Sequence, residues 1–308
     1  MTERAERLHA SHWQGVVYLT GGGSPLLSDL LSIPGASNTV LEAAVPYAAK
    51  ALSDLLGTTP EQAASNQTGR ALSMRAYQRA RDLGATEAFG IGLSASLSSS
   101  LQKKGQTRAH WAIQTAEKSS CFELLLDNAD PRYAQELQLN EAIWATIELC
   151  LLSSEQQHHA SKFAMREYSA PASWQPLLAA APYATCTQQH DGRLLLPGSF
   201  NPAHDGHREM LATAEAITGL SGAFEMTLRN ADKPDLDYLT AHERLEGLAE
   251  RPVWLTNLSN FEQKAKQFPH ATFVLGTDTL SRIAEPRFYA DDPVRMLDAL
   301  NNLAAQGA

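Results

Sequence analysis

One segment in the last third of the chain combines residue types that bind and transfer phosphoryl groups. Its ten residues are, in order, Gly198, Ser199, Phe200, Asn201, Pro202, Ala203, His204, Asp205, Gly206 and His207. His204 and His207 stand three positions apart, a spacing at which two imidazoles converge on one ligand at a helix start. Imidazoles donate hydrogen bonds to phosphate oxygens and carry protons, so the pair can stabilise charge on a transferring phosphoryl group. The segment therefore predicts a phosphate site.

The elements around this segment are those that such a site needs. An apolar run at 194–197 predicts a strand directly before it, and residues 208–218 predict a helix after it. Loops that follow the strands of an open parallel sheet lie at the edge where these sheets bind ligands. The next helix offers free N–H groups and the positive end of its dipole to an anion. Gly198 allows the backbone to approach a phosphate closely.

Two other interpretations of the histidine pair compete with this one. The first is an ordinary strand, turn and helix with two surface histidines, and the complete segment in its context argues against it. The second is a divalent metal held by both imidazoles. Asp205 is the acidic residue at this spacing, and it would point away from the face that carries the histidines. We therefore predict no metal bound directly by protein side chains.

Strands and helices alternate through the rest of the last third. Strands are predicted at 224–228, 253–256 and 271–275, and helices at 240–250, 261–267 and 293–304. Thr240, with Glu243 three residues on, has the pattern of a helix N-terminus. The alternation predicts a Rossmann-like α/β domain, with a parallel sheet, right-handed crossovers and helices on both faces.

The ten-residue segment and the Phe-Val-Leu-Gly-Thr-Asp stretch at 273–278 resemble the nucleotidylyltransferase superfamily, in particular the nicotinamide and nicotinate mononucleotide adenylyltransferases. The resemblance covers about 193–290. It implies nucleotidyl transfer from a nucleoside triphosphate, accompanied by Mg²⁺, to a mononucleotide or related phosphate in pyridine-nucleotide (NAD) metabolism. It makes His204 and His207 the catalytic residues. The nucleotide-binding residues that it implies are Gly198, Ser199, Phe200, Asn201, Gly206, Lys233, Gly276 and Asp278.

Two features leave alternatives to this function. Lys233 is implied to reach a phosphate, and a solvated loop lysine is an equal alternative. The superfamily also carries a Ser-Ser-Thr-x-x-Arg-like segment beyond this region, and none follows Asp278. Either the natural protein continues past Ala308 and this chain is truncated, or the triphosphate site is incomplete. A non-catalytic nucleotide-binding protein is therefore a further alternative.

Another glycine loop, Thr-Gly-Gly-Gly-Ser at 20–24, lies near the start of the chain, and we call it the first glycine loop. It follows an apolar run at 16–19 and precedes leucines at helical spacing, so it predicts another strand, loop and helix. Backbone N–H groups of such a turn can bind phosphate, and a purely structural glycine turn is the alternative. Further helices are predicted near 48–56, 68–83 and 130–153, and strands at 88–93 and 109–115.

Residues 13–152 resemble the C-terminal domain of the competence-damage-inducible protein family, on residues 20–24, 33–37, 47–57, 90–94 and 111–113. The resemblance implies an α/β sandwich that deamidates nicotinamide mononucleotide with a Ser, a Tyr, a Lys and a Thr. The nucleophile position falls on Thr20, with Ser24 as a nearby alternative. The Tyr and Thr positions fall on Tyr47 and Ser94.

The general base of this implied site is missing. The family's Lys falls on Leu52, and Lys50 would serve only in a shifted register. An amide-cleaving hydroxyl needs an adjacent base. We therefore expect a degenerate deamidase site, in a domain retained for binding or for assembly of a homo-oligomer. An active nicotinamide mononucleotide deamidase, an amide hydrolase, is the alternative.

Length and composition indicate how the chain divides into domains. With 308 residues, of which 44% are apolar, the chain can bury two cores. We predict a deamidase-like domain at 1–168, a linker at 169–191 and a nucleotidylyltransferase-like domain at 192–308. The linker is inferred from three prolines and the lack of a period, with a surface helix near 175–181 as the alternative.

Net charge and cysteine spacing indicate which binding partners and which cellular location to expect. The net charge of −9 argues against nucleic-acid binding, which needs clustered Lys and Arg, and leaves small-molecule nucleotides as partners. Cys121, Cys150 and Cys186 are far apart and form neither a metal-spaced pair nor a disulfide framework. No apolar run is long enough to span a bilayer, and the N-terminus lacks a secretory pattern. We expect no membrane partner and a cytoplasmic protein.

Overall fold

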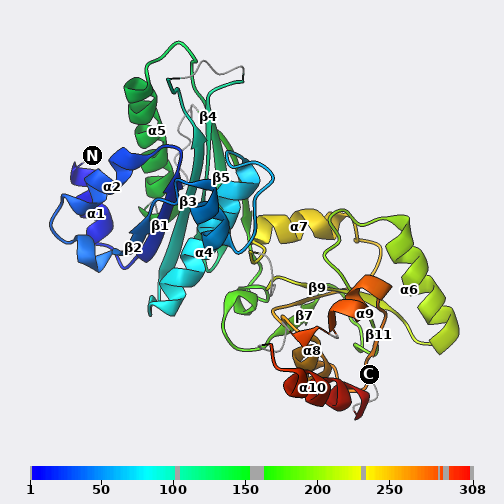
Figure 1. The fold of residues 1–308 in the computed structure, drawn as a ribbon. Helices are drawn as coiled ribbons and strands as arrows, with labels where there is room; N and C mark the ends of the chain where they lie inside the picture. Colours follow the sequence, from blue (N-terminus) through cyan, green and yellow to red (C-terminus); the bar gives the residue numbers. More distant parts are fainter. Residues whose placement is uncertain are drawn as a thin grey trace. The chain divides into compact units, whose positions relative to one another are not determined.

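The computed structural model describes residues 2–100, 105–152, 163–229, 234–283, 285–286 and 291–305. They form two compact units, many of whose elements are labelled in Figure 1. The first unit is Met1–Ala170 with Asp232–Leu239, and the second is Pro171–Ala231 with Thr240–Ala308. Each unit has its own sheet and helices, which confirms the prediction of two α/β domains. None of the described helices is both long and apolar enough to cross a membrane.

The sheet of the first unit has six strands in the order β2-β1-β3-β4-β5-β6. Its strands are β1 (Gln14–Thr20), β2 (Val40–Ala44), β3 (Ala88–Ser96), β4 (Arg108–Thr115), β5 (Lys118–Leu125) and β6 (Ala164–Ser169). β1 pairs parallel with β2 and β3, whereas β3, β4, β5 and β6 pair antiparallel in succession. The first glycine loop thus follows a strand that has parallel neighbours on both sides.

Helices cover both faces of this sheet. They are α1 (Thr2–His9), α2 (Ser24–Leu31), α3 (Ala49–Leu56), α4 (Asn66–Asp82) and α5 (Arg132–Ile147), with short turns at Ala36–Asn38 and Glu148–Leu152. α4 packs directly on β3. The two backbones are so close that a Cβ on Gly92 of β3 would lie only 2.1 Å from the backbone nitrogen of Ser73 of α4. The opposite face carries the apolar core, to which α1, α2 and α5 contribute Leu8, Leu26 and Trp144.

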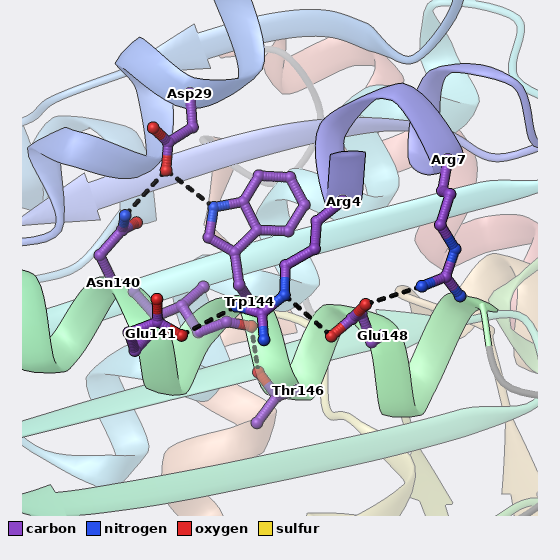
Figure 2. Close-up of polar contacts among 9 residues, drawn as sticks. Arg4, Arg7, Asp29, Asn140, Glu141, Trp144, Thr146 and Glu148 are labelled. Carbon is purple, nitrogen blue, oxygen red and sulfur yellow. Dashed lines mark hydrogen bonds and ion pairs between the residues drawn. The ribbon is translucent and has the colours of Figure 1, made fainter. Parts of the chain in front are cut away.

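Polar contacts join α1 and α2 to α5 (Figure 2). The Asp29 carboxylate accepts hydrogen bonds from the Asn140 amide at 2.8 Å and from the Trp144 indole at 2.9 Å. Arg4 on α1 forms an ion pair with Glu141 at 2.9 Å. These contacts fix α5, which is the helix that meets the first glycine loop.

The sheet of the second unit has five strands in the order β11-β8-β9-β10-β7. Its strands are β7 (Ala184–Cys186), β8 (Leu194–Pro197), β9 (Ala223–Thr227), β10 (Val253–Thr256) and β11 (Thr272–Phe273). Its helices are α6 (Asp205–Thr218), α8 (Phe261–Gln267), α9 (Thr277–Ile283) and α10 (Pro293–Ala305), together with α7 (Tyr238–Glu246) from Thr240 onward. β8 to β11 are parallel, and β7 is antiparallel to β10. The chain adds β9 and β10 on one side of β8 and then β11 on the other, which makes a switch point between β8 and β11.

Contacts on β9 show that helices lie on both faces of this second sheet. Phe224 and Glu225 are adjacent, so their side chains point to opposite faces. On one face, Phe224 contacts Phe200, which in turn contacts His207 of α6. On the other face, Glu225 forms a buried ion pair with Lys264 of α8 at 2.5 Å. This arrangement is the one predicted for a Rossmann-like domain.

Three boundaries differ from the sequence-based plan. Residues 169–191, expected as a linker, contribute the 3₁₀ turn Gln175–Leu178 and β7 to the second unit, because β7 pairs with the backbone of β10. The segment Asp232–Leu239, expected in the C-terminal domain, belongs to the first unit. α7 begins at Tyr238, so Thr240 lies inside the helix instead of capping it.

Candidate functional site

The two segments that resemble nucleotidylyltransferases meet at the switch point of the second sheet. β8 and β11 are neighbours there, with Leu195 paired to Phe273. Gly198 and Gly276 each come three residues after that pair, just past the carboxyl ends of their strands. Open parallel sheets bind ligands at this position. The topology therefore places both segments at one edge of one sheet.

The two histidines lie side by side at the start of α6. His204 is the N-cap, His207 lies in the first turn, and their rings stack with centroids 3.7 Å apart and planes inclined by 29°. The backbone N–H of His204 donates to Nδ1 of His207 at 3.3 Å. A neutral imidazole that accepts at Nδ1 carries its proton on Nε2, so His207 has an N–H to donate to a ligand. A Cβ on Gly206 would lie 3.1 Å from Nδ1 of His204, so glycine leaves room for that ring.

The surroundings of His207 favour a neutral ring in the free protein. Burial, with the nearby His204 and Arg208 as smaller causes, lowers the pKa of His207 below its ordinary value of 6.5. A bound phosphate would favour the imidazolium and raise this pKa again. The Arg208 guanidinium pairs with Asp205 at 3.1 Å and donates to the carbonyl of Gly247 at 3.0 Å. The start of α6 can therefore take up an anion and a proton together.

Phe200 packs on the buried side of the loop. Its side chain is buried, and its ring lies 5.1 Å from those of both Phe224 and His207. A Cβ on Gly198 would be 2.6 Å from the Phe200 ring, so packing inside the loop requires this glycine. Ser199 and Asn201 are exposed. A ligand at this loop would thus meet Ser199 and Asn201, with Phe200 behind them.

Arg244, in the last turn of α7, makes a loop contact that the sequence analysis missed. Its Nη1 donates to the carbonyl of Ser199 at 2.8 Å. The two residues are 45 positions apart, so no local pattern connects them. By binding this carbonyl, Arg244 braces the loop that leads to His204.

Two of the implied nucleotide-binding side chains lie outside the part of the chain that the structure describes. One is Lys233, which falls between the described residues. The other is that of Asp278, whose backbone lies in the first turn of α9. Gly276 directly precedes this helix, and a Cβ there would meet no atom of the described residues within 4 Å. The backbone at Gly276 therefore borders open space.

The first glycine loop is occupied by a side chain of its own unit. The backbone N–H of Gly23, at the start of α2, donates to a carboxylate oxygen of Glu136 at 2.7 Å. Arg132 binds this carboxylate at 3.3 Å and the carbonyl of Gly21 at 3.0 Å. Gly21 has a φ of +80°, and a Cβ there would lie 1.9 Å from the carbonyl oxygen of Ala95. An internal carboxylate thus fills the position that a phosphate would take.

Four polar residues form one row across the first sheet at the end of β1. Strand pairing places Thr20 next to Ser94, Ser94 next to His110, and His110 next to Glu123. The Thr20 hydroxyl donates to the carbonyl of Pro46 at 3.1 Å.

Ser94 and His110, the two residues at the centre of this row, are buried. The Ser94 hydroxyl donates to the carbonyl of Ala63 and accepts from the backbone N–H of Ser65. Burial lowers the pKa of His110, whose Nε2 lies 3.9 Å from Glu123. The sequence analysis missed His110, because only strand register places it beside Ser94.

The other implied deamidase residues lie apart from this row. Tyr47 is 67% exposed, and Ser24 is exposed at the start of α2. Leu52, at the general-base position, is buried, while Lys50 is exposed and pairs with Asp54 at 2.5 Å. Of the four predicted residues, the structure brings Thr20 and Ser94 together.

Comparison with solved structures finds similarity to competence-damage proteins in the N-terminal half. The competence/damage inducible protein CihA from Agrobacterium tumefaciens is 19% identical with a TM-score of 0.42, over 47% of this chain and 92% of that one. A competence-damaged protein (CinA) superfamily protein from Enterobacter cloacae is 16% identical with a TM-score of 0.39, over 47% and 87%. No curated protein matches the chain. Residues 195–304, which include His204 and His207, match the model of the cytidylyltransferase-like family.

Proposed function

We propose that this protein transfers a nucleotidyl group from a nucleoside triphosphate to the phosphate of a mononucleotide at the loop of His204 and His207. The observation that carries the proposal is the stacked imidazole pair at the start of α6, on the loop that follows β8 at the switch point. The cytidylyltransferase-like match supports the reaction class. The adenine base, the mononucleotide acceptor and a role in NAD metabolism rest on the resemblance to the mononucleotide adenylyltransferases.

The proposed reaction is one displacement at phosphorus. An oxygen of the acceptor phosphate bonds to the α-phosphorus while the bond from this atom to the β-bridging oxygen breaks, and pyrophosphate leaves with the electron pair. Negative charge then grows on the phosphate oxygens. The Nε2–H of His207, the ring of His204 and the first N–H groups of α6 would stabilise this charge. Mg²⁺ enters with the triphosphate as part of the substrate.

Calorimetric titration of ATP and of CTP, each with Mg²⁺, tests the site. The loss of one charge-assisted hydrogen bond should weaken binding by about tenfold to a hundredfold, so His204→Ala/His207→Ala should weaken it at least that much. His12→Ala, which removes an exposed histidine of the first unit, should bind as the wild type does. Equal binding by the double variant would show that these residues are misassigned. Release of pyrophosphate with nicotinamide or nicotinate mononucleotide tests the acceptor, and its absence with both would reject it.

We propose in addition that the first unit lacks amide hydrolase activity and serves binding or assembly. This proposal is supported by Glu136, which fills the glycine loop, and by Leu52 at the base position. The assay is ammonia release from nicotinamide mononucleotide, which should stay at background. Ammonia release that disappears in Thr20→Ala would contradict the proposal.

A further inference from the structure

A short segment of the second unit, which we call the arm, comprises residues 179–183 and directly precedes β7. We call the loop that carries His204 and His207 the histidine loop. β8, β9 and β10 run parallel, and β7 is antiparallel to β10, with Ala184 paired to Thr256. The chain therefore enters β7 beside the carboxyl end of β10, at the same edge of the sheet as the histidine loop. Open parallel sheets bind ligands at this edge.

The side chain of Asn257, directly after β10, fixes the arm in place. Its Nδ2 donates to the carbonyls of Ala179 at 3.1 Å and Ala181 at 2.8 Å. Its Oδ1 accepts from the backbone N–H of Tyr183 at 2.7 Å, and its own backbone N–H donates to the Tyr183 carbonyl at 3.2 Å. Asn257 is buried, so water does not compete for these bonds. The backbone of Tyr183 is thus held at the carboxyl edge from both sides.

The sheet register shows on which face the Tyr183 side chain lies. Thr256, the partner of Ala184 in the sheet, donates to Glu225 on the face that α8 covers. Residues paired directly across two strands share a face, and neighbours along a strand alternate. Ala184 therefore lies on the α8 face, and Tyr183 lies on the opposite one. Phe200 of the histidine loop packs on that opposite face, through its contact with β9. Tyr183 and the histidine loop thus share both an edge and a face of the sheet.

The Tyr183 ring is available for a ligand. Its side chain is half-buried, and within the described residues its ring contacts no other ring and its hydroxyl makes no hydrogen bond. In the strand order, β7 is three strands from β8, which is about 14 Å at the usual spacing. The phosphates, sugar and base of an extended nucleotide can span this distance. Aromatic side chains stack on bases of any kind, because every base has a π face.

We propose that Tyr183 stacks on the planar ring of a nucleotide whose phosphates lie at the histidine loop, with Asn257 as a positioning residue; this deepens the proposed function and rests on it. The ring is either the base of the triphosphate or the base of the acceptor mononucleotide, and the same stacking chemistry serves both. The arm lies before residues 195–304, which match the cytidylyltransferase-like family. The contact is therefore one that the family match does not supply.

Calorimetric titrations with and without a base test the proposal. The ligands are inorganic tripolyphosphate, ATP and CTP, each with Mg²⁺, and nicotinamide and nicotinate mononucleotide. Tyr183→Leu should weaken the binding of the stacked ligand between about fivefold and about 150-fold. It should leave the affinity for tripolyphosphate, which has no base, unchanged. The ligand that loses affinity tells whether the triphosphate or the acceptor reaches the arm.

Three further variants complete the design. Tyr183→Phe keeps the ring and should bind every ligand as the wild type does. Tyr133→Leu, which removes an exposed tyrosine of the first unit, is the matched control and should do the same. Asn257→Ala should weaken the same ligand as Tyr183→Leu and spare tripolyphosphate, because the arm is released while the histidine loop is intact. Unchanged binding in Asn257→Ala would remove the positioning role.

The proposal is overturned if Tyr183→Leu binds every ligand that has a base as tightly as the wild type does. It is also overturned if the affinity for tripolyphosphate falls by the same factor, because the substitution then acts on the phosphate site. Should Tyr183→Leu fail to fold, Tyr183→Gln decides by the same comparison. A wild type that binds nucleotides, with no change in the variants, rejects the stacking alone. A wild type that binds none of the ligands rejects the proposed function and the stacking together.

Discussion

The two glycine loops of this protein share one local framework and differ in what occupies it. Each follows a parallel strand and leads into a helix, from β1 into α2 and from β8 into α6. In the first loop the Glu136 carboxylate accepts from the N–H of Gly23 at the helix start. In the second, two stacked imidazoles stand at the helix start, and His204 is exposed. The same framework thus meets an internal carboxylate in one unit and an exposed imidazole in the other.

The difference shows that strand, loop and helix do not by themselves make a binding site. Free N–H groups at a helix start attract any carboxylate or phosphate that reaches them. In the first unit this anion is the carboxylate of Glu136 on α5, and Arg132 balances its charge. Substitutions in the first loop should therefore change stability, whereas those in the second should change nucleotide affinity.

The largest effect is expected for Gly21→Ala. The new Cβ would lie 1.9 Å from a backbone oxygen at a φ of +80°, and neither strain can be relieved by moving a side chain. We expect the free energy of unfolding to fall by more than about 3 kcal/mol. Urea denaturation of the full chain measures this, with Gly57→Ala, which has a positive φ and open space around it, as the control. Equal losses in both variants would mean that the close contact is unimportant.

Glu136→Ala should have the next largest effect. It removes the partner of the Gly23 N–H and of Arg132, and leaves that N–H buried without an acceptor. A loss of about 2 kcal/mol in the free energy of unfolding is expected, at unchanged nucleotide affinity. Urea denaturation measures the free energy of unfolding, and calorimetric titration of the same sample measures the nucleotide affinity. A variant as stable as the wild type would show that this loop is not held by the carboxylate.

The second loop should respond to pH through His207. Its pKa is lowered in the free protein, so the ring is neutral at pH 7, and a bound phosphate favours the charged form. Nucleotide binding should then take up a proton and strengthen as pH falls from 8 to 6, by at most about tenfold per pH unit for one proton. Calorimetry in two buffers of different ionisation enthalpy measures the uptake. If His207→Gln shows the same uptake, another group is responsible.

The smallest effect is expected for Gly206→Ala, the counterpart of Gly21→Ala. Its Cβ would meet only the movable ring of His204, at 3.1 Å from Nδ1. Alanine favours the helix by up to about 1 kcal/mol, so stability should be unchanged or higher. Affinity for the nucleotide should fall a few fold, because the ring is displaced. A fall in stability without loss of affinity would remove the contrast between the two loops.

Most elements that carry the loops could be predicted from local patterns. The predicted bounds of β8 and α8 agree with the structure, and α6 begins three residues before the predicted start at 208. β2, β5, β6 and β7 were not predicted. β6 has mostly exposed or half-exposed residues, and β7 has three residues, so neither has a clear apolar alternation. Such strands depend on pairing with neighbours more than on their own composition.

By itself the sequence determined the two frameworks of strand, loop and helix and the spacing of the histidine pair. Each of these is encoded within roughly a dozen neighbouring residues, where apolar period and glycine position act directly on the backbone. Only the tertiary structure decided which loop is filled and that the segment Asp232–Leu239 belongs to the first unit. Glu136 meets Gly23 across 113 positions, and Asp237 meets Arg70 across 167. Such contacts depend on strand register and helix packing, and these are properties of the whole folded unit that no local pattern contains.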